Sequence, residues 1–105
     1  RIRSSLKLID ENPEKPHTVT ELARHAGMCR ERFSTEFKKL TGISPAKYCM
    51  ERRLQALRIM MRNSDCTVVE LADRFGFSSP YHLSKVFKKY YGLPPGEYQK
   101  NKFLF

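Results

Sequence analysis

Five side chains that can bond to nucleic-acid bases or their phosphates lie at helical spacing about a third of the way along the chain. Arg30 can donate two hydrogen bonds to a guanine, Glu31 can accept one from a cytosine, and Thr35 can touch a thymine methyl group. Positions i, i+1, i+4, i+5 and i+8 form one exposed face of an α-helix, and here they are Arg30, Glu31, Ser34, Thr35 and Lys38. The chemistry that this face indicates is the reading of base pairs in a DNA groove.

Several of these side chains have a second interpretation. Glu31 is equally suited to an ion pair with Arg30 or Arg32 on a solvated helix face. Lys38 and its neighbour Lys39 suit phosphate contacts, or simple exposure to solvent, better than the reading of bases. The spacing alone leaves these alternatives open.

A second face of the same kind lies about fifty residues further along the chain. Pro80 and Tyr81 offer apolar surface and one hydroxyl there, and Lys85 is the expected base contact. Tyr81 is equally suited to packing on its own helix. When Phe33 is aligned with Leu83, the exposed positions of this second face are Ser79, Pro80, Tyr81, Ser84, Lys85 and Lys88.

Both faces belong to a sequence unit that occurs twice. Glu21 to Tyr48 reads ELARHAGMCRERFSTEFKKLTGISPAKY, and Glu70 to Tyr98 reads ELADRFGFSSPYHLSKVFKKYYGLPPGEY. Matching residues lie 49 positions apart before one inserted residue and 50 positions apart after it. Two similar units can place two similar surfaces at a fixed spacing, and DNA is a target with a fixed helical repeat.

The elements that must position these faces are all predicted to be helices. Within residues 30–40, Phe33, Phe37 and Leu40 form the inward stripe. No stretch alternates as a strand, so the expected fold is all-α with about seven helices. Apolar spacing and capping residues place the helices at 2–11, from Thr18 or Thr20 to His25, at 30–40, 44–62, 68–75, 79–91 and 94–100.

In each unit a short helix, a glycine turn at Gly27 or Gly76 and a longer helix follow one another. This is the helix-turn-helix pattern, whose second helix can enter a major groove of DNA. Residues 44–62 would form a connector roughly 28 Å long. Successive major grooves lie about 34 Å apart, a distance that the connector spans together with the width of its flanking helices. The pattern predicts one domain over 1–105, with helix-turn-helix subdomains at 1–43 and 63–105 joined by the connector helix 44–62.

The charge balance favours a polyanionic partner. Of 105 residues, 20 are Lys or Arg and 11 are Asp or Glu, which gives a net charge of +9 and a pI of about 9.8. Residues 1–62 carry a net charge of +7 and residues 63–105 carry +2, so the first half is expected to supply more of the electrostatic attraction. The chain does not begin with Met and no apolar run is long enough to span a membrane, so we expect a domain of a longer protein without a membrane segment.

Cysteine and histidine usage indicates neither a disulfide framework nor a metal site. The three cysteines are odd in number and lack Cys-x-x-Cys spacing, which favours a reducing cytosolic setting. No histidine has metal-ligand spacing with a cysteine, and no nucleophile is paired with a base. We therefore expect no metal, no cofactor and no enzymatic activity. Cys29 is interpreted as a substitute helix cap rather than as a redox switch.

The chain resembles the DNA-binding domain of the AraC/XylS family of bacterial transcription regulators over nearly its whole length. The most specific match is GFSSPYHLSKVFKK at residues 76–89, followed by Gly92-Leu93-Pro94-Pro95 and Tyr98. The chain departs from the family in three places that affect packing and capping more than chemistry. They are Leu83 where Phe is frequent, Pro94 where Ser or Thr usually precedes the proline, and the run Arg53-Leu54-Gln55-Ala56-Leu57 for the usual Arg-Leu-x-x-Ala pattern.

The resemblance implies two recognition helices in successive major grooves of double-stranded DNA, and a transcription regulator that activates through RNA polymerase. It also implies a cytoplasmic, nucleoid-associated bacterial protein, monomeric as this fragment and dimeric in full through an N-terminal domain. The family's reading positions coincide with the two faces, and the expected base contacts are Arg30, Glu31, Ser34, Thr35, Ser79, Pro80, Tyr81, Ser84 and Lys85. The expected phosphate contacts are Thr18, Thr20, Lys38, Lys39, Arg53, Thr67, Lys88 and Lys89.

Two further expectations concern the target. The faces share only Ser34 with Ser84 and Lys38 with Lys88, so one chain should read two different half-sites and the DNA site should be asymmetric. Arg53 is equally suited to bracing nearby acids. The alternative function is a protein-interaction module whose basic face docks an acidic partner.

Overall fold

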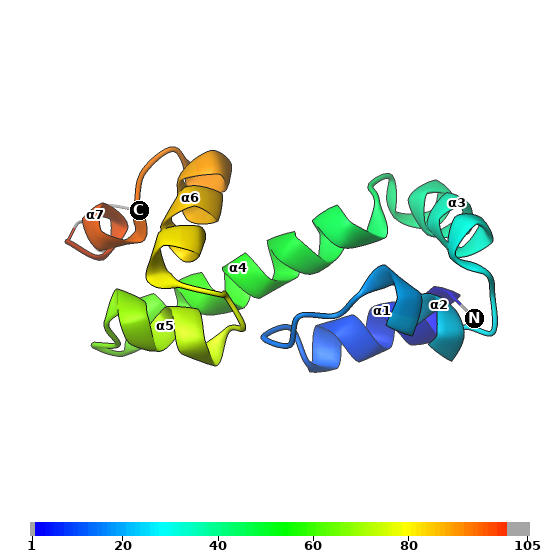
Figure 1. Ribbon diagram of the computed structural model, residues 1–105, viewed down its shortest axis with the longest axis horizontal. Coiled ribbons are helices and arrows are strands. Elements are labelled where there is room, and N and C mark those ends of the chain that lie inside the picture. The colour runs from blue at the N-terminus through cyan, green and yellow to red at the C-terminus, as the bar shows by residue number, and fades with distance from the viewer. Residues whose placement is uncertain (1, 101–105) are drawn as a thin grey trace. The chain divides into compact units, whose positions relative to one another are not determined.

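The computed structural model describes residues 2–100, and within that range every regular element is a helix (Figure 1). The fold matches the expected all-α class and the expected order of elements. The helices are α1 (Ile2–Glu11), α2 (Val19–His25), α3 (Arg30–Thr41), α4 (Pro45–Asn63), α5 (Val68–Arg74), α6 (Pro80–Tyr91) and α7 (Pro95–Lys100).

The short first helix of each helix-turn-helix, α2 or α5, begins at an equivalent threonine. Thr18 caps α2 and accepts a hydrogen bond from the Glu21 N–H at 3.1 Å. Thr67 caps α5 in the same way, and the Glu70 carboxylate also accepts the Thr67 N–H, which completes a capping box. The start of the second helix, left open between Thr18 and Thr20, is thus set by Thr18.

The longer helix of each repeated unit, α3 or α6, ends at a glycine that adopts a left-handed backbone. Gly42 follows α3 with φ of 86°, and Gly92 follows α6 with φ of 82°. Each glycine N–H bonds to the carbonyl four residues earlier, at Lys38 or Lys88. Side chains other than glycine are strained in this conformation, which explains why the sequence signal for the helix end was reliable.

The chain forms two compact units that meet within α4, between Arg53 and Leu54. The core of the first unit is built from α1, α2 and α3, and its buried residues are Ile9, Leu22, Ala23, Ala26, Phe33 and Phe37. In the second unit the buried apolar residues include Leu54, Leu57, Met61, Leu71, Ala72, Phe75, Phe77, Leu83, Phe87 and Tyr98. The predicted functional boundaries at 43/44 and 62/63 remain predictions.

One predicted core residue is not buried. Leu40, expected on the inward stripe of residues 30–40, is 48% exposed. The Phe37 ring is instead covered by Tyr48 from α4, whose centroid lies 5.3 Å away in an edge-on arrangement. Because the stripe reaches the last turn of α3, Leu40 lies beyond the part of the helix that the core covers.

Candidate nucleic-acid interface

The predicted reading face of the first unit lies on one side of α3. Arg30, Glu31, Thr35 and Lys38 are exposed, and Ser34 is half-buried. The helix begins after Cys29, which has extended backbone angles but makes no side-chain capping bond. Cys29 thus occupies the N-cap position, as expected of a cap substitute, but its side chain makes no capping hydrogen bond.

Local hydrogen bonds fix the chemistry that this face presents. The Thr35 hydroxyl donates to the Glu31 carbonyl at 3.0 Å, so its hydrogen is used within the helix and the methyl group is the part left for other contacts. No ion pair joins Glu31 to Arg30 or Arg32 within residues 2–100. The Glu31 carboxylate is therefore available as an acceptor, as base reading requires.

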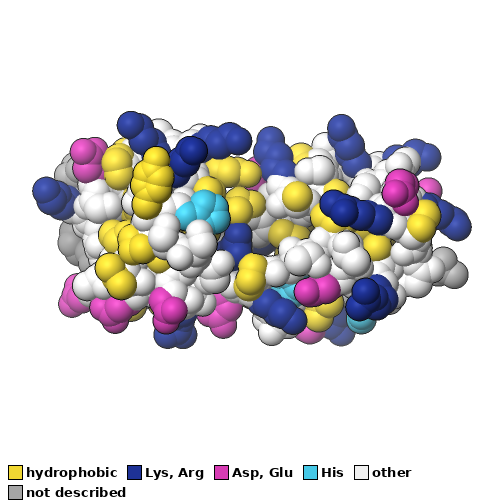
Figure 2. All heavy atoms as spheres, viewed as in Figure 1, with side chains coloured by type: hydrophobic (Ala, Val, Ile, Leu, Met, Phe, Trp, Pro, Cys, Tyr) yellow, Lys and Arg dark blue, Asp and Glu magenta, His cyan; other side chains and the backbone are white. Residues whose placement is uncertain are grey.

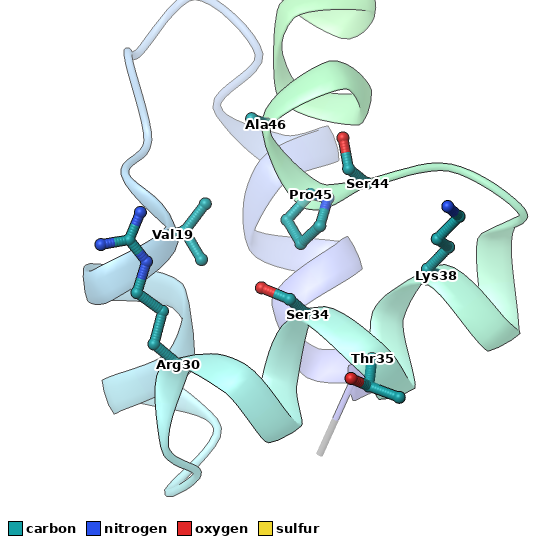
Figure 3. A pocket seen from close by; sticks show the side chains of 8 residues that line it. All are labelled: Val19, Arg30, Ser34, Thr35, Lys38, Ser44, Pro45 and Ala46. Carbon is teal, nitrogen blue, oxygen red and sulfur yellow. The ribbon is translucent and has the colours of Figure 1, made fainter.

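A recess of about 340 Å³ opens beside α3. In Figure 3, Arg30 extends alongside Val19 from the start of α2, and Ser34 faces Pro45 at the start of α4. The apolar side chains that line the recess are Val19, Pro45 and Ala46. Arg30 lies at one end of the recess and Lys38 at the other. Such a surface suits the sugar and phosphate groups of a DNA strand that runs beside the helix.

The second reading face lies on α6 and is chemically different. Ser79 is the N-cap, and its hydroxyl accepts the His82 N–H at 3.0 Å, so this predicted base contact is engaged in capping. Pro80 follows in the first turn, and Tyr81 is 71% exposed. The exposure of Tyr81 favours contact with a partner over packing on its own helix. Lys85 and Lys88 are exposed, whereas Ser84 is half-buried.

The predicted phosphate contacts occupy three kinds of position. Thr18 and Thr67 are helix caps, Thr20 lies inside α2, and all three are exposed. Four lysines, two near the end of α3 and two near the end of α6, are also exposed. They are Lys38, Lys39, Lys88 and Lys89.

Arg53 differs from the other predicted phosphate contacts because it is buried. Its side chain is 9% exposed, and Nη2 lies 3.5 Å from the Met50 sulfur. Burial lowers the pKa of the Arg53 guanidinium. It lines a smaller recess of about 250 Å³ together with Lys15 and His17, and a phosphate would have to enter that recess to reach it.

Sequence reasoning left one donor out of the second face. His82 is exposed on α6, and its Nδ1 atom lies 3.2 Å from the Ser78 hydroxyl. It aligns with Arg32 in the repeat, which is exposed on α3. The alignment of two hydrogen-bond donors at one repeat position was the signal that could have found it.

Neither a metal-binding group nor a membrane-spanning helix occurs among the described residues. No group of three or more His, Cys, Asp or Glu side chains within residues 2–100 is placed to hold a metal ion. None of the helices described is long and apolar enough to cross a membrane.

Comparison with known proteins identifies the family. Residues 22–101 match a family of helix-turn-helix domains. The chain belongs to the AraC-type helix-turn-helix DNA-binding domains, a non-enzymatic family of transcription regulators. It is 31% identical over 98 residues to the multiple antibiotic resistance protein MarA of Escherichia coli, covering 93% of this chain and 77% of MarA.

Two further relatives extend the comparison. An uncharacterized HTH-type transcriptional regulator of Haemophilus influenzae is 33% identical over 104 residues, which cover 99% of this chain but 35% of the relative. The chain thus spans about a third of the length of the first curated relatives it matches. The crystal structure of the DNA-binding domain of AdpA in complex with a target DNA superposes with a TM-score of 0.87 at 29% identity, covering 94% of this chain and 89% of that chain.

Proposed function

We propose that this chain binds double-stranded DNA sequence-specifically and without catalysis, through α3 and α6 in successive major grooves. The observation that carries the proposal is the exposed, hydrogen-bonding face of α3 beside its recess, repeated as an exposed face on the equivalent helix α6. The relative AdpA, crystallised with a target DNA, supports the same use of this fold. The division into subdomains 1–43 and 63–105 with a connector at 44–62 is part of the proposal.

Specificity is proposed to come from the nine predicted base contacts, with the lysines and helix caps holding the backbone. The first face offers a guanidinium, a carboxylate and a methyl group, so it suits base pairs read by hydrogen bonds. The second offers Pro80 and the exposed Tyr81, so it suits apolar contacts such as thymine methyl groups. The proposed target is therefore an asymmetric site read in one direction.

Selection from random duplexes tests this proposal most directly, because it measures binding and yields the site together. We expect one asymmetric sequence and an affinity that falls steeply with salt, with a slope of about −0.9 per phosphate neutralised. A flat salt dependence and no enriched sequence would contradict DNA binding. If the chain enriches no DNA sequence but binds an acidic protein, the result would instead support the protein-interaction module.

We further propose that the full protein activates transcription in the bacterial cytoplasm by contacting RNA polymerase. Figure 2 shows Lys and Arg side chains gathered over α6, whereas acidic side chains gather over α5. On α5, Val69 is 64% exposed and Asp73, one turn later, is also exposed, so this helix leaves a surface for a protein partner. When the full-length protein that contains this chain is added, transcription in vitro from a promoter with the selected site should rise. A decrease would indicate a repressor.

A further inference from the structure

His82 is held in one orientation on the surface of α6. Its Nδ1 atom lies 3.4 Å from the Ser78 backbone nitrogen and 3.2 Å from the Ser78 hydroxyl oxygen. The imidazole ring also packs edge-on against Phe77, with centroids 5.4 Å apart and planes at 66°. Phe77 is only 6% exposed and is therefore held in the core, so it restricts the orientation of the imidazole ring that packs on it.

These contacts assign the hydrogen of the neutral ring. A backbone N–H can only donate, so the Nδ1 atom facing Ser78 must accept. The neutral imidazole then carries its hydrogen on Nε2, at the opposite edge of the ring. His82 therefore presents an oriented N–H donor from an exposed side chain.

The position of His82 on α6 indicates what this donor meets. His82, Lys85 and Lys89 are spaced i, i+3 and i+7, so they lie along one stripe of the helix, and all three are exposed. Residues 80–91 contain no acidic side chain that would compete for the donor. The equivalent stripe of α3 carries Arg32 at its start and Lys39 at its end. Each stripe thus begins with a hydrogen-bond donor, Arg32 or His82, and ends with a lysine.

We propose that His82 binds a backbone phosphate of the DNA through Nε2–H, at the edge of the groove that α6 enters. This inference rests on the proposed DNA binding. A phosphate oxygen accepts hydrogen bonds and never donates, which matches a group that presents only a hydrogen. Arg32 would hold the equivalent phosphate in the first unit, so the contact is shared by the two halves although their reading residues differ.

The test begins with Leu, Arg and Gln variants of His82, measured on the duplex selected by the wild-type chain. We expect His82→Leu to weaken binding about tenfold for every sequence and to leave the base preference unchanged, since a bond to a charged group is lost. His82→Arg copies the first unit and should restore the affinity. It should also make the slope of the logarithm of the binding constant against the logarithm of the salt concentration more negative by about 0.9. His82→Gln should lie between the two, and Ser78→Ala is the matched control, expected to change affinity much less because its backbone N–H remains.

A second measurement identifies the phosphate itself. Neutral methylphosphonates placed one at a time in the second half-site should weaken wild-type binding at one position and should have no further effect there on His82→Leu. Equal binding by wild type and His82→Leu, or a changed preference at one base pair, would overturn the inference while leaving DNA binding intact. If wild type binds no duplex at all, the proposed function fails as well. Should the variants not fold, the Nε2–H resonance of wild-type His82 decides: slowed hydrogen exchange in the complex supports the contact, and unchanged exchange refutes it.

Discussion

Arg58 lies over the ring of Tyr91, with Cζ 4.7 Å from the ring centroid. The same guanidinium lies 5.9 Å from the Tyr98 centroid, so one side chain of α4 contacts both α6 and α7. In the first unit, Arg52 lies 5.0 Å from the Tyr48 ring, but both belong to α4 and are one turn apart. Arg58 therefore joins three helices through stacking on two rings, whereas Arg52 stacks on a neighbour of its own helix and reaches α1 through an ion pair with Asp10.

This difference predicts unequal costs for removing the two arginines. Arg58→Ala should lower the free energy of unfolding by about 1–2 kcal/mol, because a partly desolvated cation–π contact and its packing are lost. Arg52→Ala should cost less than about 1 kcal/mol, since its ion pair with Asp10, at 3.5 Å, is between side chains 43% and 50% exposed. Urea denaturation of the two variants gives the comparison. Equal losses would mean that Arg58 does not hold α6 and α7 to α4.

The caps of the two short helices should also differ in strength. Thr67→Ala removes a capping box in which Glu70 reciprocates, whereas Thr18→Ala removes a single bond to the Glu21 N–H. We expect a loss of about 1–2 kcal/mol for Thr67→Ala and about 0.5–1 kcal/mol for Thr18→Ala. Thermal unfolding followed by circular dichroism measures both. Conversion of each threonine to Ser is the control, since the capping oxygen is retained.

Stability at alkaline pH should depend on Cys49. Burial raises the pKa of the Cys49 thiol from 9.0 to about 11. Between these values the unfolded chain loses the thiol proton and the folded chain keeps it, so the free energy of unfolding should fall as pH rises from about 9 to about 11. Comparison of wild type with Cys49→Ala by denaturation across this range isolates the effect, because other groups titrate equally in both. Parallel curves would show that the thiol is solvated when folded.

Most of the fold was predictable because the residues that start and end its helices act locally. Gly42 and Gly92 end their helices through a backbone conformation that few other residues adopt, and Thr67 starts its helix through side-chain bonds to residues three positions away. Such signals depend on a few neighbouring residues. The predicted ends at Leu40 and Arg62 accordingly differ from the observed ends, Thr41 and Asn63, by one residue each.

What could not be predicted depends on contacts between distant segments. Leu40 is exposed at the end of α3, while Tyr48 from α4 packs on Phe37. Arg53 is buried on α4, beside a recess that Lys15 and His17 from the loop before α2 also line. Helical spacing does not contain this information. The orientation of His82 is likewise set by Ser78 and Phe77, which precede the helix and lie off its periodic pattern.

Arg30 gives the sharpest test of the reading face, because it is exposed at the start of α3 and lines the recess beside it. If its guanidinium reads a guanine, Arg30→Ala should weaken binding to the selected duplex by about 1–3 kcal/mol and relax the preference at one base pair. Lys38→Ala should instead weaken binding to all sequences alike and make the salt dependence shallower by about 0.9, as expected for a phosphate contact.

Arg30→Lys separates the two roles of the Arg30 side chain. Lysine keeps the positive charge but cannot present the planar, two-pronged donor that matches a guanine edge. Base reading therefore predicts that Arg30→Lys resembles Arg30→Ala in losing the preference, whereas a phosphate contact predicts that it resembles wild type. Binding measured on the selected duplex and on duplexes carrying each of the other three base pairs distinguishes these outcomes. Retention of the full preference in Arg30→Lys would assign Arg30 to the backbone and leave Glu31, Ser34 and Thr35 as the readers of the first half-site.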